Sequence, residues 1–124
     1  MQHWTADEVL GSPQEHTFRR MVVQHERIRA GLLGYAAGAV VGLHAHLQSD
    51  EVFHLLSGAA TFVVDGVPHE VAAGDLLFVE AGERHEIRVH DAPIVLLAAV
   101  APNLDDAWIA QPGSASSAAP SAGR

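Results

Sequence analysis

The sequence predicts an all-β fold, either a sandwich or a barrel, in a single domain. Gly, Pro, Asn and Asp divide the middle of the chain into short apolar runs. None of the central runs keeps the apolar period of three to four residues that marks a helix. Many short strands at close, regular spacing are typical of a sandwich or a barrel. The 124 residues can bury one core and leave no room for two domains of ordinary size.

The first strands follow a short N-terminal extension. Residues 4–10 are predicted to form one or two helical turns after Thr5, which is a favoured N-cap residue. Phe18–Gln24 and Ile28–Tyr35 are separated by polar residues, and the second of them ends at "GYAAGA". Val40–His46 ends at the polar sequence "LQSD". We therefore expect three strands before this turn.

The central strands are separated by tight turns. Glu51–Leu56 ends at "SG", and Ala60–Val64 ends at Asp65-Gly66. This pair is the strongest hairpin signal in the chain, because both residues tolerate a positive φ. His69–Val71 then runs to "AAGD", and Leu76–Val79 runs to "EAGER". Each of these four strands is bounded by residues that favour turns.

Two more strands complete the predicted fold, namely His85–Val89 and Ile94–Ala101, on either side of "DAP". The sequence "APNLDDAWIA" is predicted to form a turn and an apolar segment that packs back on the strands. Residues 111–124 are nearly all Ala, Ser, Gly and Pro, so they cannot bury enough apolar surface to offset the entropy of ordering. We expect one domain over residues 1–110 and a disordered tail over residues 111–124.

The composition excludes several classes of function. The chain has no cysteine for a disulfide, thiolate metal site or nucleophile, and no lysine for a Schiff base. A formal net charge of −8 and the lack of a basic stripe argue against nucleic acid as a partner. No run is long and apolar enough to span a membrane, and the N-terminus lacks a signal-peptide pattern. We expect a soluble, cytoplasmic protein without a membrane partner.

A cluster of histidines and one glutamate predicts a metal site. His44 and His46 are two residues apart on one strand, so their side chains point to the same face. The turn "LQSD" resets this alternation, so that Glu51 begins the next antiparallel strand beside these histidines. His85 begins a further strand, from which it is presented across the site. Three imidazoles and a carboxylate suit one divalent ion of Fe, Mn, Ni, Zn, Co or Cu.

The remaining histidines are not expected to bind this ion. His54 is three residues after Glu51 on the same strand and faces the opposite way, so it is expected between the sheets or at a subunit interface. The dispersed histidines are expected at the surface: His3, His16, His69 and His90. The residues that share a strand face with Glu51 or His85 are apolar. We therefore predict a small-molecule cavity lined by Phe53, Leu55, Ile87 and Val89.

The same residues resemble a known family. Gly38, His44, His46, Glu51 and Gly58 match the first motif of the cupin superfamily, G-x5-H-x-H-x4-E-x6-G, at every specified position. This agreement of spacing raises a His-x-His pair, which is weak evidence alone, to a specific signal for fold and metal.

The second cupin motif, G-x5-P-x-G-x2-H-x3-N, is matched in part. Gly74, Gly82 and His85 agree with it, whereas Glu80 stands where the motif has proline and Val89 where it has asparagine. The loss of the proline at Glu80 is expected to make the turn less rigid. Neither departure removes a metal ligand. The resemblance covers about residues 28–100. It implies a single antiparallel jelly-roll β-barrel with one divalent metal ion held by His44, His46, Glu51 and His85.

The cupin fold serves many reactions, so the residues must indicate the chemistry. By parity, the other titratable side chains of the central strands point away from the metal: His54, Glu86, Arg88 and His90. Without a separate acid or base, metal-centred chemistry is favoured. The leading hypothesis is a metal-dependent dioxygenase or oxygenase-like enzyme acting on a small oxygenated or aromatic molecule, with Glu51 as the ligand most able to act as a base.

Two alternatives remain open. A metal-dependent isomerase or epimerase needs a separate acid and base; similar proteins use a histidine and a tyrosine, and the only tyrosine is Tyr35. His25 and Arg27 are unassigned candidates for this role. The other alternative is a non-catalytic module that binds a metal or a small molecule. Small single-barrel proteins of this kind are commonly homodimers, and we expect a homodimer here because edge strands need covering or pairing.

Overall fold

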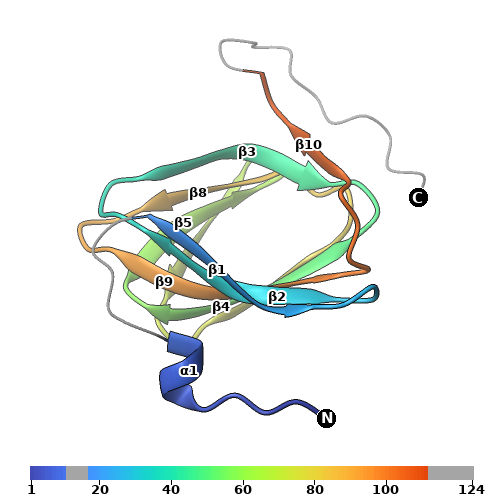
Figure 1. The fold of residues 1–124 in the computed structure, drawn as a ribbon. Coiled ribbons are helices and arrows are strands. Elements are labelled where there is room, and N and C mark those ends of the chain that lie inside the picture. The colour runs from blue at the N-terminus through green and yellow to red at the C-terminus, as the bar shows by residue number, and fades with distance from the viewer. Residues whose placement is uncertain (11–16, 112–124) are drawn as a thin grey trace.

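Ten strands form two antiparallel sheets that face each other (Figure 1). The computed structural model describes residues 1–10 and 17–111, and these counts refer to those residues. The first sheet has the order β1-β2-β9-β4-β7, and the second has the order β10-β3-β8-β5-β6. The elements are α1 (Ala6–Leu10), β1 (Phe18–Gln24), β2 (Arg29–Tyr35), β3 (Val40–His46), β4 (Asp50–Ser57), β5 (Ala59–Val64), β6 (Val67–Ala72), β7 (Leu76–Val79), β8 (His85–Val89), β9 (Ile94–Ala101) and β10 (Ala107–Ile109).

The all-β prediction is confirmed. All nine predicted strands are present, and β1, β3, β7, β8 and β9 have the predicted bounds. The other four differ by one or two residues at one or both ends. β10 was predicted only as an apolar segment; its three residues are too few to show a strand pattern, and pairing with β3 makes it a strand. The predicted disordered tail lies outside the described residues apart from Gln111, and so does His16.

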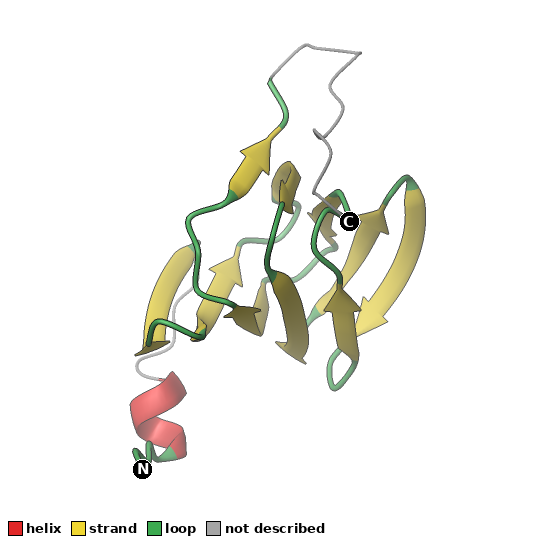
Figure 2. Ribbon diagram, turned by 90° about the vertical axis from the view of Figure 1, so that its right-hand side faces the viewer, coloured by secondary structure: helices red, strands yellow, loops and turns green. Residues whose placement is uncertain are grey.

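The helix α1 begins after Thr5, as predicted. The Thr5 hydroxyl accepts a hydrogen bond from the Glu8 N–H at 3.2 Å, and the Glu8 carboxylate accepts one from the Thr5 N–H at 3.3 Å. This reciprocal pair is a capping box. Figure 2 shows α1 in red beside one end of the sheets. No helix within residues 1–10 and 17–111 is long and apolar enough to cross a membrane.

Several turns between strands require a positive φ. Asp65 and Gly66 have φ angles of 47° and 81° and form the predicted hairpin between β5 and β6. Gly58 has a φ of 82°, and a Cβ atom there would lie 2.5 Å from the carbonyl oxygen of Pro93. Both facts explain a glycine at this position. The four glycines of the two motifs all have a positive φ: Gly38, Gly58, Gly74 and Gly82.

The hydrophobic core lies between the two sheets. Phe53 and Leu55 of β4 meet Phe62 of β5 and Ile87 of β8, and none of the four is more than 2% exposed. The rings of Phe53 and Phe62 pack edge to face with their centroids 5.3 Å apart. This packing fixes β4 and β8, the two strands that carry Glu51 and His85.

The outer face of the first sheet is apolar at its β7 edge. Leu76 and Phe78 are 68% and 58% exposed, and their register neighbours on β4 are His54 and Val52. His54 therefore lies on the outer face and not between the sheets, because its parity is opposite to that of the core residue Phe53. An exposed apolar edge strand is a surface that partner chains commonly cover.

Candidate metal centre

The predicted ligands come from both sheets. His44 and His46 lie on β3, and His85 lies on β8, the neighbour of β3 in the second sheet, directly opposite His44 in the register. Glu51 lies on β4 in the first sheet. The predicted pairing of its strand with that of His44 and His46 is therefore wrong. The turn "LQSD" carries the chain from one sheet to the other, so Glu51 reaches the histidines across the space between the sheets.

Three of the four predicted ligands form one compact group. The ligand atoms of His44, Glu51 and His85 lie within 4.8 Å of one another, an arrangement able to hold a metal ion. The rings of His44 and His85 are 4.2 Å apart at their centroids. His46 lies at the edge of this group, with its Nε2 atom 3.4 Å from Glu51 Oε1 and its ring centroid 5.9 Å from that of His44. Glu51 and His85 are 6% and 0% exposed.

Each of the three imidazoles has an acceptor oxygen beside its Nδ1 atom. His44 Nδ1 lies 2.8 Å from the Gly42 carbonyl oxygen, and His85 Nδ1 lies 3.1 Å from the Glu83 carbonyl oxygen. His46 Nδ1 lies 3.4 Å from Asp106 Oδ1. Acceptors at Nδ1 favour the tautomer with its proton there, which leaves the lone pair on Nε2. An acceptor oxygen beside the second ring nitrogen is typical of metal-binding histidines.

The buried acceptors of the centre need a cation. His85 Nε2 and Glu51 Oε1 face each other at 3.4 Å, and neither has a hydrogen-bond partner within the described chain. With its proton on Nδ1, the His85 ring is an acceptor at Nε2, as the carboxylate is at Oε1. Two buried acceptors in contact are unfavourable unless a proton or a metal ion lies between them. These residues therefore fit a divalent metal ion.

The pKa shifts at the centre are consistent with a metal site. Burial acts to raise the pKa of the Glu51 carboxyl, but the His46 and His85 imidazoles beside it outweigh burial and lower the pKa to about 2. Burial lowers the pKa of His44, and the nearby His85 lowers it further. Its contact with Glu51 raises the pKa of His46 in spite of burial. The carboxylate is thus ionised and His44 is neutral at neutral pH, the forms that ligate metals.

Asp106 joins the centre from the segment after β9. β10 pairs with β3 so that Ala107 lies opposite His46, which brings the preceding Asp106 beside the His46 ring. Asp106 Oδ2 accepts a hydrogen bond from the Gln48 N–H at 2.7 Å. Burial acts to raise the pKa of Asp106, but this hydrogen bond and others lower it. No spacing in the sequence could have identified Asp106, because its position depends on the pairing of β10 with β3.

The turn that presents His85 is held by hydrogen bonds in place of the motif proline. The Glu83 carboxylate accepts a hydrogen bond from the Glu80 N–H at 2.7 Å, and the Glu83 N–H donates to the Glu80 carbonyl at 3.0 Å. Proline has no N–H and could not make the first of these. The Gly82 N–H also donates to the His46 carbonyl at 2.7 Å, which ties the turn to β3.

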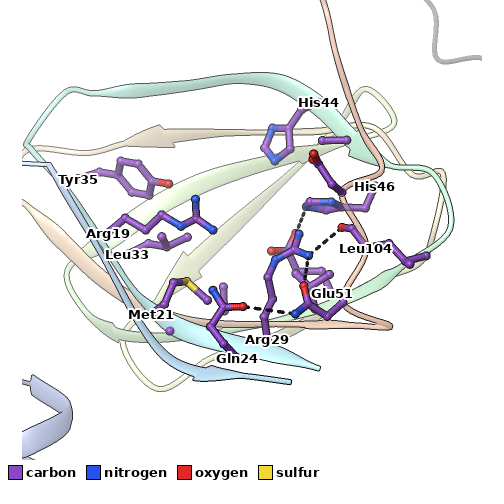
Figure 3. Close-up of a pocket in the computed structure, with 16 residues that line it drawn as sticks. Arg19, Met21, Gln24, Arg29, Leu33, Tyr35, His44, His46, Glu51 and Leu104 are labelled. Atoms are coloured by element: carbon purple, nitrogen blue, oxygen red, sulfur yellow. Dashed lines mark hydrogen bonds and ion pairs between the residues drawn. The ribbon is translucent and has the colours of Figure 1, made fainter. Parts of the chain in front are cut away.

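A cavity of about 510 Å³ opens beside the centre (Figure 3). His44, His46 and Glu51 form one part of its lining, and the rest comes from β1, β2, β9 and the segment after β9. The predicted lining is wrong, because the hydrophobic core contains Phe53, Leu55, Ile87 and Val89. Strand parity identifies the inward face but not the depth along the strand, and these residues lie where the two sheets pack together.

Two arginines of the first sheet line the cavity, and sequence reasoning identified neither. Arg29 of β2 donates from Nη1 to Asn103 Oδ1 at 2.9 Å and to the Leu104 carbonyl at 2.8 Å. Arg19 of β1 lies on the same side of the cavity as Tyr35 (Figure 3). In the part of the chain that the structure describes, neither arginine forms an ion pair with a carboxylate.

Tyr35 also lines the cavity, with its hydroxyl turned inward (Figure 3). Burial raises the pKa of its phenol, and Glu51 raises it further, against the effect of Arg19. The phenol is therefore protonated at neutral pH and is a proton donor. His25 and Arg27, the unassigned candidates, are exposed and lie outside the lining.

Three of the four histidines predicted to lie at the surface are among the described residues, and all three are exposed: His3, His69 and His90. His90 Nε2 lies 3.2 Å from Glu70 Oε2 on the outer surface of the second sheet. His54 faces away from the cavity, so its exclusion from the ligand set agrees with the structure.

Comparisons with known proteins agree with this architecture. A curated relative from Thermotoga maritima, named as an oxalate-binding protein, is 38% identical over 50 residues, which are 40% of this chain and 41% of the relative. The match thus spans less than half of that relative's length. A solved structure from Klebsiella pneumoniae, described as a protein with a double-stranded β-helix domain, has a TM-score of 0.75 at 18% identity and covers 87% of this chain and 90% of its own.

A second solved structure, TT1209 from Thermus thermophilus, has a TM-score of 0.70 at 27% identity and covers 82% of this chain and 98% of its own. The family model described as "Cupin domain" matches residues 31–100, and this range contains all four predicted metal ligands. Because the match spans more than half of the sequence, the chain belongs to the cupin family.

Proposed function

We propose that the protein is a metal-dependent enzyme with dioxygenase-like chemistry that acts on a small oxygenated molecule held in the cavity. The observation that carries the proposal is the convergence of His44, His46, Glu51 and His85 beside the cavity, with an acceptor oxygen beside the Nδ1 atom of each imidazole. A divalent ion bound there would supply Lewis acidity, redox capacity if it is Fe, Mn, Ni, Co or Cu, and open positions for substrate oxygens.

The chain's own residues would bind and orient the substrate. Met21 and Leu33 give part of the lining an apolar surface that limits water. Arg19 and Arg29 attract negative charge to the same cavity. Glu51 faces the cavity, so it is the metal ligand placed to accept a proton from a bound substrate, although its lowered pKa makes it a weak base.

The partial similarity to an oxalate-binding protein supports a small, oxygen-rich ligand. Such a molecule presents adjacent oxygens, as the substrates of metal-centred chemistry commonly do. The volume of the cavity, about 510 Å³, falls within the usual range of small-molecule sites.

Oxygen uptake tests the proposal. Metal-free protein is loaded with Fe²⁺, Mn²⁺ or Ni²⁺ and incubated with flavonols, catechols, β-diketones and small organic acids. We expect uptake with at least one pair of metal and substrate, abolished in His44→Ala and retained in His54→Ala, which removes an imidazole that faces away from the cavity. Absence of uptake with every pair would rule out the oxygenase.

A second candidate is a metal-dependent isomerase or epimerase, and Tyr35 favours it. The sequence argument against this class was the lack of an acid near the metal, and the protonated phenol in the lining removes that argument. Exchange of substrate C–H hydrogen with deuterated water, followed by NMR, would detect this chemistry, and Tyr35→Phe should abolish it. Ligand binding with neither oxygen uptake nor exchange would favour a non-catalytic binding module.

A further inference from the structure

We infer that Arg29 anchors a carboxylate subsite in the cavity, so that the ligand is a small organic acid with one carboxylate on this guanidinium. The orientation of the rest of the ligand toward the metal ligands rests on the proposed function, whereas the subsite itself does not.

Arg29 is held rigidly and keeps one edge of its guanidinium free. Both hydrogens of Nη1 are used, on Asn103 Oδ1 and the Leu104 carbonyl. Asn103 is fixed in turn, because its side-chain amide donates to the His25 carbonyl at 2.7 Å. Nη2 and Nε have no hydrogen-bond partner among residues 1–10 and 17–111. These two donors form the fork that binds a carboxylate through two parallel hydrogen bonds.

The charge of the cavity calls for an anion. The chain has 15 acidic residues and only 7 basic ones, yet Arg29 and Arg19 lack a carboxylate partner in the part of the chain described. Glu51 and Asp105 are the carboxylates of the lining. A divalent ion together with two arginines outweighs them, so a bound anion would balance the cavity.

The lining favours a carboxylate over a phosphate. Phosphate sites usually use the N-terminus of a helix or a nest of backbone N–H groups. Here strands and the segment after β9 supply the lining, and no residue of α1 takes part. Met21, Leu33 and Ala98 provide apolar surface for the hydrocarbon part of an organic acid.

The subsite is built from segments on either side of the cupin match. Arg19 and Arg29 precede residue 31, and Asn103 and Leu104 follow residue 100, whereas the match covers residues 31–100. The range that carries the metal-binding residues is therefore distinct from the segments that would hold the carboxylate.

Calorimetric titration with oxalate, malonate and succinate tests the subsite on the full chain, both metal-free and metal-loaded. Arg29→Gln removes the fork and its charge. Arg27→Gln is the matched control, because it removes the same charge from an exposed residue outside the lining. We expect Arg27→Gln to bind at least one acid as wild type does. Arg29→Gln should bind it on the order of 10- to 100-fold more weakly, the loss typical of hydrogen bonds to a charged group.

Arg29→Lys should give an intermediate loss, because lysine keeps the charge but not the fork. Equal binding by Arg29→Gln and Arg27→Gln, or no binding of any acid by wild type, would overturn the subsite. Inorganic phosphate bound as tightly as the acids, with the same dependence on Arg29, would overturn the carboxylate assignment. Matching circular dichroism spectra and urea midpoints confirm that the variants fold.

Metal analysis of the same samples separates this inference from the proposed function. If the wild type takes up no metal, and Arg29→Gln binds the acids more weakly than the wild type does, the proposed enzyme is disproved and the subsite is supported. A metal-loaded protein that consumes oxygen with a neutral β-diketone, while its binding of acids is unaffected by Arg29→Gln, would support the enzyme and disprove the subsite.

Discussion

Replacing Asp106 with asparagine should weaken metal binding, because it reverses the hydrogen-bonding character of the group beside His46. Asp106 Oδ2 accepts a hydrogen bond from the Gln48 N–H at 2.7 Å, and Oδ1 lies 3.4 Å from His46 Nδ1. An asparagine that keeps its oxygen on the Gln48 N–H must turn its NH₂ group toward His46. A donor at that place favours the tautomer with its proton on Nε2, which removes the lone pair that would bind the metal.

We expect the affinity for Zn²⁺ or Mn²⁺ to fall about 10- to 100-fold, the usual effect of losing such an outer partner, which corresponds to about 1.4 to 2.8 kcal/mol. Calorimetric titration of metal-free protein measures this loss. Long-range ¹H–¹⁵N NMR of the imidazole gives a second readout without metal. The proton of His46 should lie on Nδ1 in the wild type and shift to Nε2 in Asp106→Asn.

Asp105→Asn is the matched control for this prediction. It removes the same charge from the adjacent residue, which is exposed, lines the cavity and forms no hydrogen bond or ion pair in the described chain. Its metal affinity should stay within about twofold of wild type, since exposed charges contribute little. Equal losses in the two variants would refute the reasoning, and so would a His46 tautomer that does not change.

Two further predictions concern stability and assembly. Gly58→Ala should lower the free energy of unfolding by about 2 to 4 kcal/mol, because alanine is strained at a φ of 82° and its Cβ would meet the Pro93 carbonyl. Gly38→Ala is its control, with a φ of 72° but open space, and should cost about 1 kcal/mol; equal urea midpoints would contradict this account. We also expect a homodimer that covers Phe78 on the outer face of β7, so that Phe78→Arg sediments as a monomer at concentrations where wild type is dimeric. A monomeric wild type would show the homodimer prediction to be wrong.

Local signals in the sequence were enough to identify the strands but not their pairing. The pair Asp65-Gly66 marks a hairpin because both residues adopt a positive φ, and this requirement is local. The turn before Glu51 was also identified correctly. Which strand lies beside Glu51 depends on contacts between distant parts of the chain, and β4 pairs with β7 and β9 in place of β3. Alternation along a strand carries no information about this choice.

The same limit separates the predicted ligands from the missed residues. Parity and one turn were sufficient to predict that His44, His46 and Glu51 point toward the same interior space, although Glu51 does so from the opposite sheet. The sequence does not indicate at which point along a strand the hydrophobic core ends and the cavity begins. The predicted lining was wrong for this reason. Arg29 and Asp106 were missed because each takes its place from a partner far away in the sequence, Asn103 and His46 respectively.

The segment between β9 and β10 connects the two proposed parts of the site, the carboxylate subsite and the metal centre. Asn103 holds Arg29 on the wall of the cavity, and three residues later Asp106 faces the His46 ring. The same short segment therefore sets the position of the Arg29 guanidinium, which would bind the carboxylate of the substrate. It also sets the orientation of the His46 imidazole, which would bind the metal ion. A change in its conformation would alter both together, so ligand selectivity and metal affinity are expected to change in parallel when this segment is altered, even though every metal ligand lies within residues 31–100.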